Sequence, residues 1–229
     1  MERVNLLDDD ALHKSPVVAN CTMNRERQLS GSNGYSFELK LDITSWLASQ
    51  LEARSVRWLD VCCGTGRALI EATQLSDLLG HPNRLKITGI DLAGHFLSHN
   101  SKCLELVKSS IESWHPQSEI DLITCVHGLH YIGDKLAVVK KLANCLSENG
   151  VFLANIDLGN LRFRDGGSAS RTVVKRFREH GIEYDKNNRL IHCRGGKIIE
   201  SFGLSYYGAD DDAGPNYTGQ PAVNSYYGE

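Results

Sequence analysis

The sequence has no surplus of either charge and no long apolar run. Its 229 residues include 25 Lys and Arg against 28 Asp and Glu, for a formal net charge of −3. This balance indicates neither a basic face for nucleic acid nor charge-driven disorder. The longest apolar stretches have the length of a strand, far below the roughly 20 residues that cross a bilayer. The start of the chain carries three acids at residues 8–10 and no apolar secretion segment. We therefore expect no nucleic-acid partner and no membrane contact.

The seven cysteines lack the paired spacing of a zinc site or a disulfide framework. Their number is odd, no CxxC pair occurs, and they are scattered through segments predicted as strands and helices. This pattern is typical of reduced thiols in a cytoplasmic protein. We expect a cytoplasmic location and no metal.

Residues 56–73 have the pattern of a strand, a glycine-rich turn and a helix. The apolar strand ends in Asp-Val-Cys-Cys-Gly-Thr-Gly at residues 60–66, and a helical pattern begins immediately. Glycines let the backbone approach a ligand closely, and a helix start presents free N–H groups. The third glycine of a GxGxxG fingerprint and the Gly-Lys-Ser/Thr of a phosphate-binding loop are both absent. The stretch predicts a site for a nucleotide-like ligand of another kind.

A second strand is predicted at residues 85–91, and it ends in Asp91. A carboxylate at that place can accept both ribose hydroxyls of a nucleoside. It can also cap a following helix, and the two roles are compatible. We favour the ribose role.

Residues 119–132 form an Asp-led apolar strand that runs into His127 and His130. Parallel strands carry ligands at their carboxyl ends, so we expect His127 to face a cleft, with His130 as a second candidate. A histidine there can contact a ligand or act as a general base. The alternative is a histidine that packs against the helix predicted at residues 134–146.

The rest of the chain continues the alternation of strands and helices. A helix ends at Asn149-Gly150, a strand follows at residues 151–157, and a further helix is predicted at residues 171–180. Two strands are predicted at residues 190–194 and 197–200, on either side of Gly195-Gly196. A two-residue glycine turn between two strands is a strong hairpin signal. Right-handed crossovers then place helices on both faces of the sheet.

These pieces resemble the class I S-adenosylmethionine (SAM) dependent methyltransferases. The first motif of that family is an acid, a few small or apolar residues and Gly-x-Gly, as at residues 60–66; residues 89–93 and 119–132 resemble its second and fourth motifs. The resemblance covers about residues 35–205. It implies an α/β fold with a doubly wound, mainly parallel seven-stranded sheet, a C-terminal antiparallel hairpin, helices on both faces and an N-terminal lid.

The resemblance also implies SAM as the cofactor and the residues that contact it. The glycines of the turn approach the methionyl part, Asp60 orients the turn or the donor's amino group, and Asp91 holds the ribose. A third strand is predicted at residues 103–108. The family usually has an Asp soon after this strand for the adenine amino group, whereas this chain has Ser109-Ser110-Ile111. The expected cofactor contacts are Asp60, Cys62, Gly64, Thr65, Gly66, Asp91, Leu92, Ser110, Ile111 and His127.

The two ends of the chain are expected to complete the site. Residues 1–34 are predicted to be a tail and lid, poorly ordered over residues 1–16, and a helix is predicted at residues 35–51. Arg25, Arg27 and Tyr35 are candidates for a carboxylate of SAM or substrate. The alternative is a surface helix on which the arginines pair with Glu26 and Glu38.

We expect the methyltransferase domain at residues 35–207 and a tail at residues 208–229. The tail is rich in tyrosine and is predicted to be ordered. It either closes the pocket or contacts a second copy in a homodimer.

The implied reaction is an in-line transfer of the SAM methyl group to an oxygen or nitrogen of a small molecule or short peptide, for example in natural-product biosynthesis. His127 is the candidate catalytic residue. An acceptor that is already ionised needs no base. The candidate substrate contacts are Arg27, Tyr35, His130 and Tyr131. The alternatives are a non-methylating enzyme of the same fold and a non-catalytic SAM-fold protein.

Overall fold

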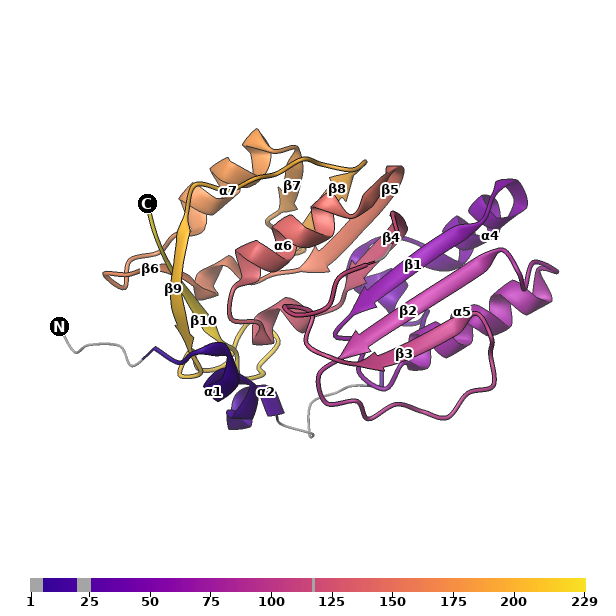
Figure 1. Cartoon of the computed structure of the whole chain (residues 1–229), viewed down its shortest axis with the longest axis horizontal. Helices are drawn as coiled ribbons and strands as arrows, with labels where there is room; N and C mark the ends of the chain where they lie inside the picture. The colour runs from indigo at the N-terminus through magenta and orange to yellow at the C-terminus, as the bar shows by residue number, and fades with distance from the viewer. Residues whose placement is uncertain (1–5, 20–25, 117) are drawn as a thin grey trace.

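Two sheets organise the chain in the computed structural model, which describes residues 6–19, 26–116 and 118–229 (Figure 1). The larger sheet has seven strands in the order β3-β2-β1-β4-β5-β8-β7. Its strands are β1 (Val56–Val61), β2 (Leu85–Asp91), β3 (Leu104–Lys108), β4 (Ile120–Cys125), β5 (Leu146–Asn155), β7 (Ile182–Asp185) and β8 (Leu190–Arg194). The first five are parallel, and β8 is antiparallel to both β5 and β7. The predicted fold class is confirmed.

Apolar side chains that alternate along the strands pack into two separate hydrophobic cores, one on each face of the sheet. In β5, Val151 and Leu153 belong to one core, whereas Phe152 and Ala154 belong to the other. A strand turns successive side chains to opposite faces, so a strand that is apolar throughout needs cover on both sides. Helices α4 (Ile43–Ala53) and α5 (Arg67–Leu78) contribute to the first core, and α6 (Lys135–Asn144) and α7 (Ser170–Glu179) contribute to the second.

The helix predicted at residues 35–51 is two helices, so this prediction was wrong. The first, α3 (Tyr35–Leu39), ends at Lys40, which has a left-handed φ of 54°. Asp42 then caps α4 by accepting the N–H of Ser45 at 3.1 Å. The apolar spacing continues across the break, and the capping signal at Asp42 was the better guide to the helix start.

The terminal hairpin exists, but its position was also predicted wrongly. It pairs β7 with β8, and Asp185 closes the turn between them by accepting the N–H groups of Asn187 and Asn188. Such Asx contacts favour tight turns. Gly195 and Gly196 serve another purpose, because a Cβ on either would lie 2.9 or 2.5 Å from a carbonyl oxygen at the start of β5.

A smaller sheet joins parts of the chain that are far apart in sequence. It has the order β6-β10-β9, with β6 (Leu161–Phe163), β9 (Ser205–Asp210) and β10 (Asn224–Gly228). The last predicted domain boundary, at residue 207, falls inside β9. The Nζ atom of buried Lys135 donates 2.8 Å hydrogen bonds to the carbonyls of Ile132 and Val223 and to Ser225 Oγ, which ties β10 to the large sheet's helix layer.

The N-terminal segment packs against this smaller sheet. Helix α1 (Asp9–Lys14) is followed by the short α2 (Pro16–Ala19), and Leu7 donates its N–H to the carbonyl of Ala209 in β9 at 2.7 Å. Leu12 is completely buried against Ala209 and Val223. The expectation of poor order over residues 1–16 is therefore wrong for residues 6–16, because apolar Leu12 and Val18 anchor them.

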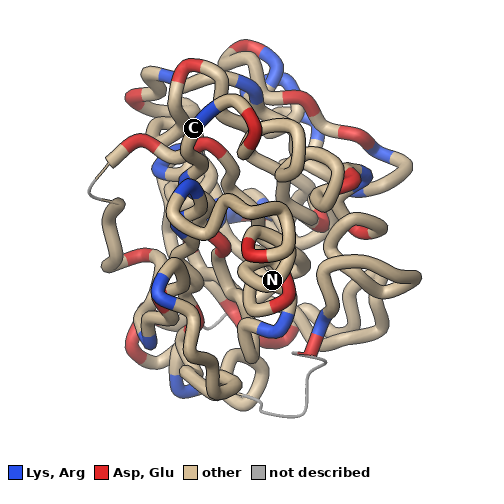
Figure 2. The backbone as a smooth tube through the Cα atoms, turned by 90° about the vertical axis from the view of Figure 1, so that its right-hand side faces the viewer, with Lys and Arg blue, Asp and Glu red and all other residues tan. Residues whose placement is uncertain are grey.

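Residues of both charges are mixed throughout the fold. Figure 2 shows Lys and Arg positions interspersed with Asp and Glu positions along the backbone. Across the described ranges, no helix combines the length and apolarity that a membrane crossing requires.

Candidate active site

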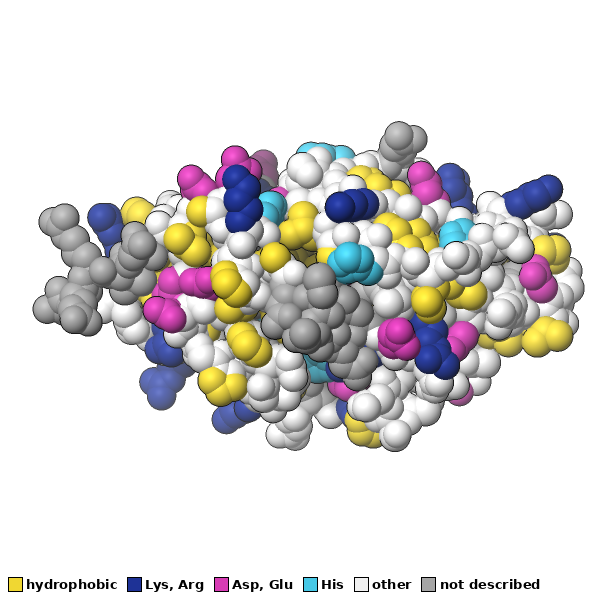
Figure 3. Space-filling model, turned by 90° about the horizontal axis from the view of Figure 1, so that it is seen from below, with side chains coloured by type: hydrophobic (Ala, Val, Ile, Leu, Met, Phe, Trp, Pro, Cys, Tyr) yellow, Lys and Arg dark blue, Asp and Glu magenta, His cyan; other side chains and the backbone are white. Residues whose placement is uncertain are grey.

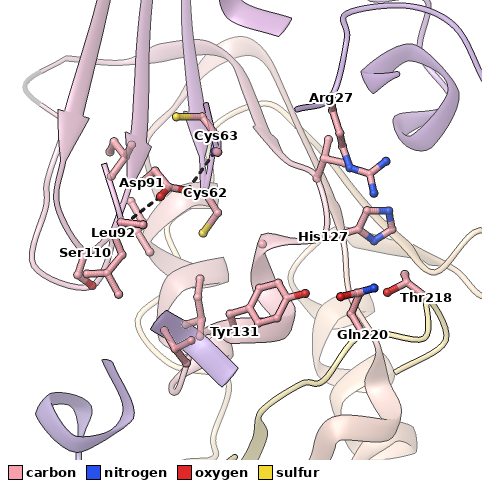
Figure 4. Close-up of a pocket in the computed structure, with 18 of the residues that line it drawn as sticks. Arg27, Cys62, Cys63, Asp91, Leu92, Ser110, His127, Tyr131, Thr218 and Gln220 are labelled. Atoms are coloured by element: carbon pink, nitrogen blue, oxygen red, sulfur yellow. Dashed lines mark hydrogen bonds between the residues drawn. The ribbon is translucent and has the colours of Figure 1, made fainter. Parts of the chain in front are cut away.

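A cavity of about 500 Å³ lies at the carboxyl ends of the parallel strands. This end of the molecule faces the viewer in Figure 3, where histidine and apolar side chains occur together near the middle. Figure 4 shows the two ends of the cavity, with Asp91, Leu92 and Ser110 at one end and Arg27, His127, Thr218 and Gln220 at the other. Cys62 and Tyr131 lie between them. The volume lies within the range of small-molecule sites.

The first end is built by the turn after β1 and the end of β2. Gly64 lines the cavity with a left-handed φ of 60°, and Cys62 beside it has a φ of 59°. The Asp91 carboxylate accepts the Gly64 N–H at 3.0 Å and the Ala93 N–H at 3.0 Å. The Asp91 side chain also lines the cavity, where a carboxylate can accept hydrogen bonds from hydroxyl donors. No helix follows Asp91, so the helix-cap alternative is wrong and Asp91 caps a turn.

The turn after β3 closes this end with polar groups. Ser110 and Ile111 line the cavity where we predicted them, with Glu112 next to them. The carboxylate oxygen Oε2 of Glu112 accepts a hydrogen bond from Ser110 Oγ at 2.7 Å and lies 2.8 Å from Nε2 of His13. Glu112 and His13 were missed by sequence reasoning. An acid two residues beyond the expected adenine position was the available signal for Glu112.

Asp60 lies beneath the cavity and does not line it. It is completely buried and accepts hydrogen bonds from Tyr35 Oη at 2.7 Å and from Thr124 Oγ1. Burial raises the pKa of Asp60 to about 7, against the opposing effect of these two donors. Tyr35 itself lines the cavity. The geometry shows Asp60 holding α3 against the end of β1.

Thr65 and Gly66 also lie outside the lining. Gly66 is the N-cap of α5 with a φ of 76°, and its N–H donates to the carbonyl of Cys63 at 3.1 Å. A Cβ there would approach Leu106 to 3.0 Å. Both residues shape the turn that presents Gly64.

The second end of the cavity contains a chain of hydrogen bonds through His127. Nε2 of His127 lies 3.0 Å from Oε2 of Glu38, and Nδ1 lies 3.2 Å from the hydroxyl of Tyr217. The other oxygen of Glu38 receives Arg27 at 3.0 Å. The hydrogen bond from His127 lowers the pKa of Glu38, against burial and with help from the charges of His127 and Arg27. The predicted alternative for Arg27, a pair with Glu38, is thus present, but both side chains line the cavity.

The tautomer of His127 follows from its partners. An ionised Glu38 only accepts, so Nε2 carries the proton, and Nδ1 accepts from Tyr217. His127 has a left-handed φ of 58°, a backbone conformation in which histidine is enriched among non-glycine residues. This conformation and the Asn155 side chain, which accepts the His127 N–H at 3.4 Å, fix where the ring points.

His127 and His130 differ in whether they reach the cavity. His130 is completely buried behind His127, with its Nε2 3.5 Å from His127 Nδ1. Burial, reinforced by His127, lowers the pKa of His130 well below its usual value. His130 therefore does not line the cavity, whereas Tyr131 does.

Thr218 and Gln220 of the C-terminal segment also line the cavity and were not predicted. Arg25 lies outside the described residues.

The residues present fit a nucleoside that carries an amino-acid tail. The cavity is lined by the Asp91 carboxylate, by the apolar side chains of Leu92 and Ile111, and by Gly64, which has no side chain to keep a ligand from the backbone. Close packing fixes the far wall, because a Cβ on Gly128 would lie 2.4 Å from that of Cys62. The described part of the chain holds no cluster of three or more metal-ligating side chains.

Comparison with known proteins identifies the family. The profile described as "Methyltransferase domain" matches residues 33–193, more than half of the chain. No curated protein sequence matches significantly.

Similar solved structures overlap with the chain only in part. They include a SAM-bound amino pentose methyltransferase from Micromonospora echinaspora involved in calicheamicin biosynthesis (20% identity, TM-score 0.37, 50% of this chain and 49% of that one). The plantazolicin methyltransferase with S-adenosylhomocysteine has 18% identity and a TM-score of 0.43, over 63% of this chain and 55% of that one. The cyclase SpnF has 18% identity and a TM-score of 0.38, over 56% of this chain and 48% of that one. The chain therefore spans about half the length of these proteins.

The profile match, the strand order and the arrangement of the cavity agree with one another. The parallel strands with an antiparallel β5-β8-β7 edge match the sheet that the sequence resemblance implied. The chain belongs to the class I SAM-dependent methyltransferase family, and SAM is its cofactor.

Proposed function

We propose that the protein transfers the methyl group of SAM to an oxygen or nitrogen atom of a small molecule or short peptide. The Gly64 and Asp91 end holds the cofactor, with Leu92, Ser110 and Ile111 around the adenine. The other end, with His127, Glu38 and Tyr131, holds the acceptor. A cavity of about 500 Å³ that must hold the cofactor leaves room for a small acceptor group.

The pair of Glu38 and His127 is the single observation that carries this proposal. A carboxylate 3.0 Å from Nε2 orients the imidazole and leaves Nδ1 as the proton acceptor. A histidine held in this way suits general-base catalysis near neutral pH. SAM supplies an activated methyl group, so the chain must orient the acceptor, exclude water and take up one proton.

Titration calorimetry with SAM, S-adenosylhomocysteine and NAD tests the first half of the proposal. We expect micromolar binding of the two sulfur nucleosides and none of NAD. Acceptors are then screened by release of S-adenosylhomocysteine. Binding without turnover on any acceptor would favour the non-catalytic alternative, and turnover without methylated product would favour a non-methylating enzyme.

A further inference from the structure

The tyrosine of the C-terminal segment reaches the nitrogen at which an acceptor would lose its proton. Tyr217 lies between β9 and β10, 90 residues from His127 in sequence, and its hydroxyl is 3.2 Å from His127 Nδ1. The side chain lines the cavity yet is 37% exposed. Its position is therefore on the boundary between the cavity and solvent.

The surroundings of the Tyr217 ring form a slot for an aromatic ring. The guanidinium carbon of Arg189 lies 4.2 Å above the ring centroid. The His130 ring meets it edge-on, with centroids 5.3 Å apart and an interplanar angle of 86°. A cation over the face and a ring at the edge are favourable arrangements for an aromatic group. Two independent elements, the turn before β8 and the turn after β4, supply these contacts.

The segment that carries Tyr217 is closed on itself. Asn216 donates its N–H to the carbonyl of Gln220 at 2.8 Å, and Ala222 donates to the carbonyl of Gly214 at 3.2 Å. Beyond it, Val223 is fixed to Lys135 and to the carbonyl of His130. Compact loops whose ends lie close together are frequently functional. Strand β10 is held separately, by the bond from Lys135 to Ser225, so a displaced Tyr217 would leave this bond in place.

We propose that the acceptor is a phenol, and that its ring and hydroxyl take the place of Tyr217 against Arg189 and His127. This rests on the function proposed above. Tyrosine is itself a phenol, so the chain's own side chain shows the hydroxyl, the base and the ring contacts in one arrangement. A carboxylate acceptor would face Glu38 and needs no base, whereas a neutral phenol has a pKa near 10 and does need one.

The proton and the methyl group balance in this step. The phenol oxygen bonds to the methyl carbon as the bond from that carbon to sulfur breaks, and the electron pair stays on sulfur as the neutral thioether. The phenol proton passes to His127 Nδ1, and Glu38 stabilises the imidazolium. Bulk water then receives the proton.

Binding of p-cresol to the Tyr217→Ala variant tests the slot without using activity. This probe is the tyrosine side chain itself, and the truncation vacates its place. We expect p-cresol to bind Tyr217→Ala at least tenfold more tightly than the wild type, and toluene, which lacks the hydroxyl, to bind the variant more weakly than p-cresol. His127→Ala in the same background should remove the preference for p-cresol over toluene.

Tyr207→Ala is the matched control. Tyr207 is 44% exposed and has Arg164 over its ring at 4.9 Å, but it does not line the cavity. Its p-cresol affinity should equal that of the wild type. If Tyr217→Ala and the wild type bind p-cresol with equal affinity, the proposal that p-cresol takes the place of Tyr217 is wrong.

The variant Tyr217→Phe gives a second test. It keeps the ring and loses only the hydroxyl bond, so it should lower the KM for p-cresol several-fold. An unchanged KM would count against the proposal.

A final measurement separates this inference from the function on which it rests. Tyr217→Ala with SAM and p-cresol should yield 4-methylanisole and S-adenosylhomocysteine. If SAM binds and other acceptors are methylated while bound p-cresol is not, the phenol assignment fails and the methyltransferase function stands. If SAM does not bind to the wild type, the proposed function fails first.

Discussion

The two ends of the cavity are built from the chain in different ways. The end proposed for the cofactor, here called the cofactor end, comes from successive strand-turn units, and its linked residues Gly64 and Asp91 are 27 positions apart. The end proposed for the acceptor, here called the acceptor end, combines Glu38 of α3, His127 after β4 and Tyr217 of the C-terminal segment, and the last two are 90 positions apart. Loops and connecting segments generally vary more between related proteins than the elements they join. The second end, which depends on such segments, is therefore where we expect a change of acceptor to be accommodated.

The largest expected effect is a loss of kcat in a variant that changes the acceptor end alone. His127→Ala removes the proton acceptor, and loss of a general base typically lowers a rate by about 10²–10⁴-fold. We expect such a loss in kcat, with SAM affinity changed by less than about threefold. Steady-state kinetics and calorimetry measure the two quantities. A parallel loss of SAM affinity would show that the ends are not independent.

Asp91→Ala changes the cofactor end and should weaken the binding of SAM. It removes the acceptor for the ribose hydroxyls and also the partner of the Gly64 N–H. Hydrogen bonds to a charged group contribute about 1.5–3 kcal/mol, so SAM affinity should fall by about ten- to a hundredfold. Calorimetry checks this value. Unchanged affinity would remove the ribose role, and Asp91→Asn, which keeps one acceptor oxygen, should lie between the two.

Glu38→Gln sharpens the comparison by changing only the charge behind His127. The amide keeps the shape but stabilises an imidazolium less well, so kcat should fall by about tenfold. Arg27→Met is the matched control because Arg27 contacts the other oxygen of Glu38. If Arg27 is only a partner of Glu38, its substitution should change kcat less and leave the acceptor KM unchanged. A large rise in KM would instead identify Arg27 as a substrate contact.

The last prediction concerns stability and not the reaction, at Asp60, which holds Tyr35 of α3 beneath the cavity. Burial raises the pKa of Asp60 to about 7, from 3.8 in the unfolded chain. Between these values the folded state binds more protons than the unfolded state, so this group's contribution to the free energy of unfolding falls as pH rises from about 4 to about 7. The full span is about 4 kcal/mol.

Urea unfolding from pH 4 to pH 8 measures this slope. The Asp60→Asn variant should show a flatter profile, since an amide does not titrate. A wild type that gains stability across this window as strongly as the variant would contradict the raised pKa.

The sequence predicted most of the residues that line the Asp91 end of the cavity and fewer of those at the His127 end; their roles towards cofactor and acceptor stay predictions. Gly64 and Ser110 come just after strands and Asp91 is the last residue of β2. Parallel strands bring their carboxyl ends together, so local patterns sufficed for these residues. Tyr217 was only part of a tyrosine-rich tail, because no local pattern states which distant side chain it meets. Glu38 was seen as a surface partner for arginine, since helical spacing does not reveal that α3 faces the cavity.

The misplaced hairpin has a related cause. Gly195-Gly196 satisfied the strongest local turn rule, but the glycines are required by a close approach to the start of β5. The less conspicuous Asp185 and Asn188 made the actual turn. The predicted lid, the three-part division of the chain and the homodimer stay predictions.

The acylation rate of the buried Lys135 can report how often the C-terminal segment detaches. Its Nζ atom lies 2.8 Å from each of three oxygen acceptors, two of them on Val223 and Ser225, just beyond the loop that carries Tyr217 (residues 214–222, the Tyr217 loop). Amine-acylating reagents need an exposed, free amine, so this lysine should be acylated only in molecules whose β10 has detached. Its labelling rate, followed by mass spectrometry beside that of the exposed lysines, counts these openings directly. If the Tyr217 loop moves alone, ligands in the cavity will leave that rate unchanged.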